Sequence, residues 1–94
     1  MKLNKSENKL IGQWLFENGK MLKDPVSERI EWLINHHLKK IISANGGWDI
    51  LYRDPEDERY WELSYPQSEL HGGGPPCLTN FTKEAAIEKY KSAI

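Results

Sequence analysis

The stretch WDILYRDPEDERYWELSY, residues 48–65, decides the fold that this sequence predicts. Its two ends, WDILYRD and RYWELSY, are rich in aromatic and aliphatic residues and predict two strands. The loop between them, residues 55–58, is polar and rich in turn formers, so the strands should pair as an antiparallel hairpin. Alternate residues of the second strand should face a helix, namely Trp61, Leu63 and Tyr65. The residues between them should face outward, namely Tyr60, Glu62 and Ser64.

A long helix is predicted upstream of this hairpin. Asp24 is a suitable N-cap, and Pro25 suits the first turn of a helix. Apolar positions then recur at helical spacing as far as Ile42, and they are Val26, Ile30, Leu33, Ile34, His37, Leu38, Ile41 and Ile42. Residues 45–47, Asn-Gly-Gly, supply a C-terminal stop. We therefore expect one helix that ends shortly before Asn45.

The remaining elements are shorter. Two apolar runs within residues 11–22 flank Asn18-Gly19, a dipeptide that favours the type I′ turn of a β-hairpin. Periodicity is lost after Pro66, and residues 78–81 then predict a short strand before a final helix capped by Thr82. This order predicts an α+β fold, with a small antiparallel sheet of hairpins and both helices packed on one face.

Length and composition point to one domain spanning residues 1–94. Cys77 is the only cysteine, so the chain forms no internal disulfide and no cysteine-based metal site, which suits a reducing cytoplasm. The N-terminal residues lack the apolar core of a signal peptide, and no segment is long and apolar enough to cross a bilayer. We expect a cytoplasmic protein without cofactors.

Charge is unevenly distributed along the chain. Residues 1–48 carry eight Lys or Arg against five Asp or Glu, whereas residues 49–71 carry seven Asp or Glu against two Arg. An acidic middle repels phosphate and attracts a basic protein, so a protein partner is favoured over nucleic acid. An RNA-binding module on the basic first half is a weaker alternative, because its lysines are scattered.

The predicted partner-binding site is the acidic group around the central hairpin. An aromatic ring among carboxylates suits a basic target, because the ring supplies packed area and the charges select the partner. The alternative is a solvated loop, as most charge runs are. The residues assigned to binding are Asp54, Glu56, Asp57, Glu58, Tyr60 and Glu62, with Glu69 and His71 at or near the edge.

Catalysis is the competing interpretation. Glu69 and His71 could act as an acid and base beside Gly72–Gly74, which suggests a small hydrolase or ligand-binding domain. No nucleophile is marked out, and Pro75-Pro76 removes two N–H donors that a phosphate cradle would need. We therefore predict no catalytic residues.

The two histidines of the predicted helix do not predict a metal site. His36 and His37 are adjacent, so they point about 100° apart. His37 follows the apolar stripe and should be a hydrogen-bonded histidine at the edge of the core. Trp32 and His36 form an aromatic pair on another face, covered by the N-terminal hairpin or the final helix, or else by a partner.

One run of residues also carries a resemblance. DILYRDPEDERYWELSYPQSELHGGGPPCL, residues 49–78, together with residues 11–14 upstream, resembles the immunity protein 27 family of bacterial polymorphic-toxin and contact-dependent growth inhibition systems. The resemblance implies a non-enzymatic protein that binds the C-terminal domain of a cognate toxin, encoded by a neighbouring gene, and blocks it in the cytoplasm. It assigns no catalytic residues. A basic toxin such as a nuclease is an inference from the charge alone, and the oligomeric state stays open.

Overall fold

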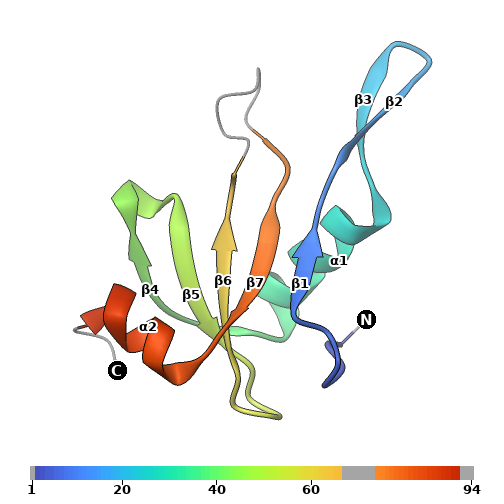
Figure 1. Ribbon diagram of the computed structural model, residues 1–94. Coiled ribbons are helices and arrows are strands. Elements are labelled where there is room, and N and C mark those ends of the chain that lie inside the picture. The colour runs from blue at the N-terminus through green and yellow to red at the C-terminus, as the bar shows by residue number, and fades with distance from the viewer. Residues whose placement is uncertain (1, 67–73, 92–94) are drawn as a thin grey trace.

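The computed structural model describes residues 2–66 and 74–91, which form two antiparallel sheets and two α-helices (Figure 1). The larger sheet has the strand order β1-β7-β6-β5-β4, and the smaller one pairs β2 with β3. The strands are β1 Lys9–Ile11, β2 Trp14–Glu17, β3 Lys20–Lys23, β4 Lys39–Ala44, β5 Asp49–Arg53, β6 Tyr60–Ser64 and β7 Cys77–Phe81. The helices are α1 Pro25–His36 and α2 Lys83–Lys89, and a 3₁₀ turn covers Asn45–Gly47. The predicted α+β class with an antiparallel sheet is confirmed.

Both strands of the central hairpin are confirmed, and so is the alternation of faces along the second strand. β5 and β6 are antiparallel, with Tyr52 opposite Trp61 and Ile50 opposite Leu63. Trp61 and Leu63 are buried in one cluster with Ile30 and Leu33 of α1. Burial of these large apolar side chains is the main stabilising contribution of this face, at about 1.5–3 kcal/mol for each.

The start of α1 is as predicted, and its end is not. Asp24 Oδ1 accepts a hydrogen bond from Ser27 N at 2.8 Å, and Pro25 is the first helical residue. The helix ends at His36, and Lys39–Ala44 forms the edge strand β4. The predicted extension to Ile42 is therefore wrong. Adjacent β-branched residues suit a strand as well as a helix, and pairing with β5 overrides the local periodicity.

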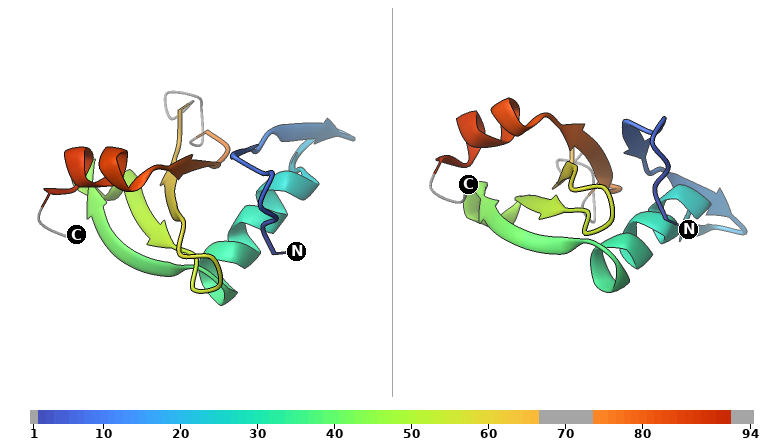
Figure 2. Two further views of the ribbon diagram at one scale, coloured as in Figure 1. Left: turned by 60° about the horizontal axis from the view of Figure 1, so that its bottom comes forward. Right: turned by 90° about the horizontal axis from the view of Figure 1, so that it is seen from below.

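The two helices lie on opposite faces of the larger sheet (Figure 2). On the face opposite α1, Leu51 of β5 is buried with Ala86 of α2 and with Tyr90, which directly follows that helix. The prediction that both helices cover one face is wrong, because both parities of the central strands carry side chains that need burial. The N-cap of α2 is confirmed, since Thr82 Oγ1 accepts a hydrogen bond from Ala85 N at 3.1 Å.

The N-terminal hairpin is also confirmed. Asn18 and Gly19 have φ values of 50° and 74°, as a type I′ turn between β2 and β3 requires. In Figure 1 the turn end of this hairpin projects away from the sheet, while its base lies beside α1. In the part of the chain that is described, neither helix has the length and apolarity that crossing a membrane demands.

Candidate functional site

The turn between β5 and β6 is organised by Asp54. Its backbone N donates to Arg59 O, and its backbone O accepts from Glu58 N, both at 2.9 Å. Its Oδ1 accepts a hydrogen bond from Glu56 N at 2.8 Å. The residue is only 2% exposed. The sequence placed Asp54 among the partner contacts, but its burial makes it the residue that holds the turn closed.

His37 lies at the edge of the core and is hydrogen-bonded, as predicted. Its Nε2 lies 3.1 Å from Oδ1 of Asp54, and both side chains are almost fully buried. The Trp32 ring stacks on His37 with centroids 6.2 Å apart and is tilted against His36 at 6.1 Å. Trp32 is half-buried against the cluster that contains α1, so α2, on the other face, does not cover it.

Three potential ligand residues meet beneath this turn. The ligand atoms of His37, Asp54 and Glu56 all lie within 4.8 Å of one another, a spacing that could hold a metal ion. From the sequence, only His36 and His37 were weighed as metal ligands. The group of three arises from the tertiary contact between the end of α1 and the turn. Asp54 Oδ1 is already hydrogen-bonded to Glu56 N and to His37 Nε2. These hydrogen bonds by themselves explain why the three residues lie close together.

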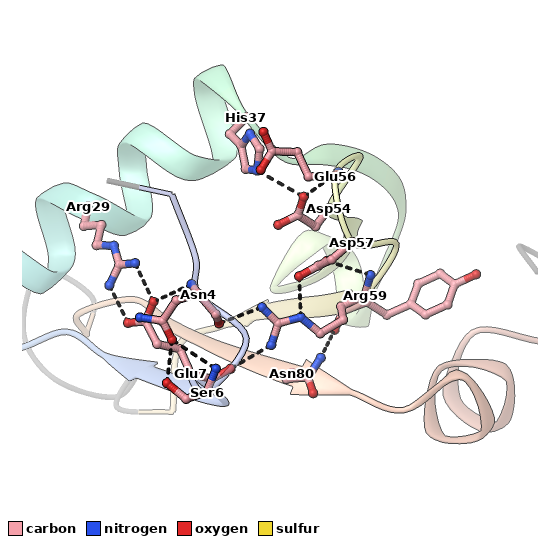
Figure 3. Close-up of polar contacts among 11 residues, drawn as sticks. Asn4, Ser6, Glu7, Arg29, His37, Asp54, Glu56, Asp57, Arg59 and Asn80 are labelled. Carbon is pink, nitrogen blue, oxygen red and sulfur yellow. Dashed lines mark hydrogen bonds and ion pairs between the residues drawn. The ribbon is translucent and has the colours of Figure 1, made fainter.

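Arg59 joins the turn to the N-terminal segment (Figure 3). Its Nε donates to Asp57 Oδ2 at 2.7 Å, while its two terminal nitrogens donate to the backbone oxygens of Glu7 and Asn4, both at 2.9 Å. The guanidinium also lies 4.9 Å from the centre of the Trp61 ring. Asp57 and Arg59 therefore stabilise the fold by tying down residues far away in the sequence.

A second arginine holds the same segment. Arg29 of α1 donates to both carboxylate oxygens of Glu7 at 2.6 Å, and to the backbone oxygen of Lys2. These hydrogen bonds lower the pKa of Glu7 to about 2. Such a bidentate pair is among the stronger charge-assisted interactions.

The two exposed acids of the turn also have basic neighbours. Glu56 Oε1 lies 2.5 Å from Lys2 Nζ, and Glu58 Oε1 lies 2.7 Å from Arg53. The hydrogen bond from Lys2 lowers the pKa of Glu56. The acidic group is thus largely compensated by bases of the same chain, which weakens the charge argument for a strongly basic partner.

Glu62 does not face solvent. It is 7% exposed and lies under α2, where Oε2 accepts a hydrogen bond from the Tyr90 hydroxyl at 2.6 Å. Lys89 Nζ lies 2.6 Å from the same oxygen. Burial, together with the hydrogen bond to Glu62, raises the pKa of Tyr90. The prediction that Glu62 shows an outward contact face is wrong, because α2 covers it.

Tyr60 shares that face. It is half-buried against the cluster under α2, and its backbone oxygen accepts a hydrogen bond from Asn80 Nδ2 at 2.9 Å. An open groove of about 370 Å³ runs past it, lined by Arg53, Glu58, Arg59, Tyr60, Asn80, Phe81, Thr82 and Lys83. Of the predicted contacts among the described residues, Glu56 and Glu58 are exposed, and Asp57 and Tyr60 are partly exposed.

The β2–β3 hairpin is a feature that the sequence reasoning missed as a contact surface. Leu15, Phe16 and Leu22 are exposed on it, and Ile11 is exposed just before it. The signal was present in the sequence, because the three consecutive residues Trp14, Leu15 and Phe16 of β2 are all large and apolar. A hairpin with one solvated face would alternate apolar and polar residues instead.

Glu69 and His71 lie outside the described residues, as do Gly72 and Gly73. Their assignment to the edge of a binding surface therefore stays a prediction. The competing acid and base pair rests on the same residues and stays a prediction as well.

Comparison with known protein families identifies a match. The family model described as immunity protein 27 matches residues 16–82 of this 94-residue chain. The matched range includes all of α1, the central hairpin and β7. No curated protein and no solved structure matches this chain.

Proposed function

Because the chain belongs to the immunity protein 27 family, we propose that it binds and neutralises a cognate bacterial toxin. The family match over residues 16–82 is the observation that carries this proposal. We further propose that the partner is the C-terminal domain of a toxin encoded by a neighbouring gene, met in the cytoplasm of the producing cell. Neutralisation then occurs by binding, without catalysis.

The arrangement of the polar groups supports a binding role. Among the described residues, Asp54, Asp57 and Glu62 are engaged in hydrogen bonds or ion pairs that stabilise the fold. A general acid or base must reach a substrate. Asp54 and Glu62 are buried, and the Asp57 carboxylate is bound by Arg59.

Among the described residues, the exposed acids of the proposed contact surface are Glu56 and Glu58. Both are exposed, and their pairs with Lys2 and Arg53 are surface ion pairs, which contribute little to stability. These acids can therefore exchange their own bases for those of a partner. A basic toxin, such as a nuclease, is the class that this part of the surface would suit.

The direct test measures toxin activity and complex formation together. The C-terminal domain encoded by the neighbouring gene is purified and titrated with this protein, and complex formation is followed by size-exclusion chromatography. We expect a complex of defined stoichiometry and loss of toxin activity at that ratio. A toxin domain that stays fully active and elutes alone at equimolar mixing would refute the proposed function.

The contact role of the acidic turn needs its own variant. Reversing Glu56 and Glu58 together to Lys should lower the association rate several-fold at low salt, because exposed charges act mainly on encounter. The matched control reverses Glu84 and Glu88, two exposed acids of α2, and carries the same change in net charge. If both double variants associate at the same rate, the turn is not part of the contact surface, although the immunity role still stands.

A further inference from the structure

The β2–β3 hairpin carries large apolar side chains in solvent. Phe16 is 75% exposed, and Leu15 and Leu22 are 45% and 41% exposed. A two-stranded hairpin is marginally stable in water by itself, and apolar side chains gathered on a projection are typical of a binding surface. A partner that covered these side chains would bury apolar surface that is now in contact with water.

The exposed side chains lie on both faces of the hairpin. Leu15 and Leu22 are opposite each other in the register of β2 and β3, so they share one face. Phe16 follows Leu15 along the strand and therefore points to the other face. A flat partner surface would cover one of these faces, whereas a cleft would cover both.

Each charged residue of the hairpin has an oppositely charged residue opposite or beside it. Glu17 is opposite Lys20 in the register next to the turn. Lys23 Nζ lies 2.5 Å from Glu31 Oε1 of α1. The hairpin therefore offers a partner no net charge to match, and its electrostatic complement is an uncharged, apolar surface.

A second copy of this chain fits these observations poorly. A two-fold contact uses the same patch on each copy, so pairing two hairpins through one face would leave the other face exposed. Covering both faces with further copies would need a second contact of a different kind, so the chain would assemble into rings or open filaments rather than a dimer. A cleft in a different protein covers both faces in one step.

The hairpin and the acidic turn lie at opposite ends of the molecule (Figure 1), whose longest dimension is 45 Å. An interface of ordinary size covers about 800 Å² of each partner, so its buried centre lies at one end only, and the turn acids at the other end act through their charge on encounter. The apolar end offers the larger gain from burial, since the turn acids are already paired within the chain.

We infer that the β2–β3 hairpin inserts into an apolar cleft of the toxin domain, with Phe16 against one wall and the Leu15–Leu22 pair against the other. This inference rests on the proposed function and identifies its principal contact.

The test compares three variants of the full chain by the dissociation constant for the purified toxin domain. Phe16→Ser removes one face, Leu15→Ser with Leu22→Ser removes the other, and Trp48→Ser is the control. Trp48 is 57% exposed but lies beyond the hairpin, directly after the 3₁₀ turn. Because all four side chains are exposed, circular dichroism should show an unchanged fold.

We expect each hairpin variant to weaken binding by at least about tenfold, mainly through faster dissociation, and Trp48→Ser to stay within about threefold. Hairpin variants that bind like the parent would overturn the inference and leave the immunity role intact. Weakening by only one of them would also overturn it, since a single face indicates a flat contact.

Two further outcomes separate the alternatives. A parent protein that does not bind the toxin domain removes the proposed function, and this inference with it. A parent that sediments as a dimer, which Phe16→Ser converts to a monomer with unchanged toxin affinity, identifies a second copy as the occupant and overturns the inference.

Discussion

Removing the charge of Glu7 should loosen the N-terminal segment measurably. Both oxygens of its carboxylate accept hydrogen bonds from Arg29 at 2.6 Å, and the Glu7 side chain is only 20% exposed. Those hydrogen bonds lower its pKa from 4.5 to about 2. At about 1.4 kcal/mol for each tenfold change in proton affinity, the difference corresponds to about 3 kcal/mol. Solvent screening at this partly exposed pair reduces the expected effect of Glu7→Gln to about 2 kcal/mol at neutral pH.

The effect should depend on pH with a defined sign. A carboxylate whose pKa is lowered by folding stabilises the native state fully above its unfolded value, and this stabilisation is lost as pH falls toward the folded value. The gap in unfolding free energy between the parent and Glu7→Gln should therefore be full above about pH 5 and shrink toward about pH 2.

Urea denaturation at several pH values measures this gap. The control is Glu88→Gln, which makes the same charge change at an exposed position of α2 and should alter stability by less than about 0.5 kcal/mol. A gap for Glu7→Gln no larger than that of the control, or one that stays constant on acidification, would refute the reasoning.

Three other substitutions test the packing on both faces of the sheet. Gly12→Ala would place a Cβ 2.7 Å from the backbone oxygen of Pro76, so we expect a loss of about 1–3 kcal/mol in urea denaturation; unchanged stability would contradict this close approach. Tyr90→Phe removes the hydroxyl that donates to buried Glu62, and thermal denaturation should show a loss of about 1–3 kcal/mol, whereas an equal melting temperature would mean that the hydrogen bond contributes nothing. Leu51→Ala, in the core beneath α2, should cost about 2–5 kcal/mol by urea denaturation, and a loss below about 1 kcal/mol would show that α2 does not seal this face.

Element boundaries could be predicted wherever one residue type has a specific local role. Asp24 before Pro25, Asn18-Gly19 and Thr82 each marked a boundary that the structure confirms. Caps and tight turns depend on hydrogen bonds and φ values within a few residues, so the local sequence carries the information.

The edge strand Lys39–Ala44 could not be recognised in this way. Its isoleucines continue the apolar spacing of α1, and the choice between helix and strand depends on whether β5 offers an edge to pair with. β5 belongs to another segment of the chain, so periodicity within one window cannot report it.

The acidic residues of the candidate site could be predicted from the sequence, but which of their side chains are exposed could not. Glu62 alternates with Trp61 and Leu63, which predicts an outward side chain. However, Lys89 of α2 and Tyr90, the residue after that helix, cover Glu62 and pair with it. Asp54 likewise belongs to an acidic run, but it is buried against His37, which follows the end of α1 and is hydrogen-bonded to Asp54. In both cases the partner comes from a distant part of the chain.

The sequence by itself determined the α+β class, the central hairpin with its inward face, and a family resemblance that the match to residues 16–82 supports. These features depend on residue order and strand alternation. Only the tertiary structure decided which acids are free, because burial and ion pairing depend on which segments meet: α2 over Glu62, α1 beside Asp54, and the N-terminal segment against Arg59. It also showed that the hairpin with Phe16 stands clear of the sheet, because no other described element covers that side chain.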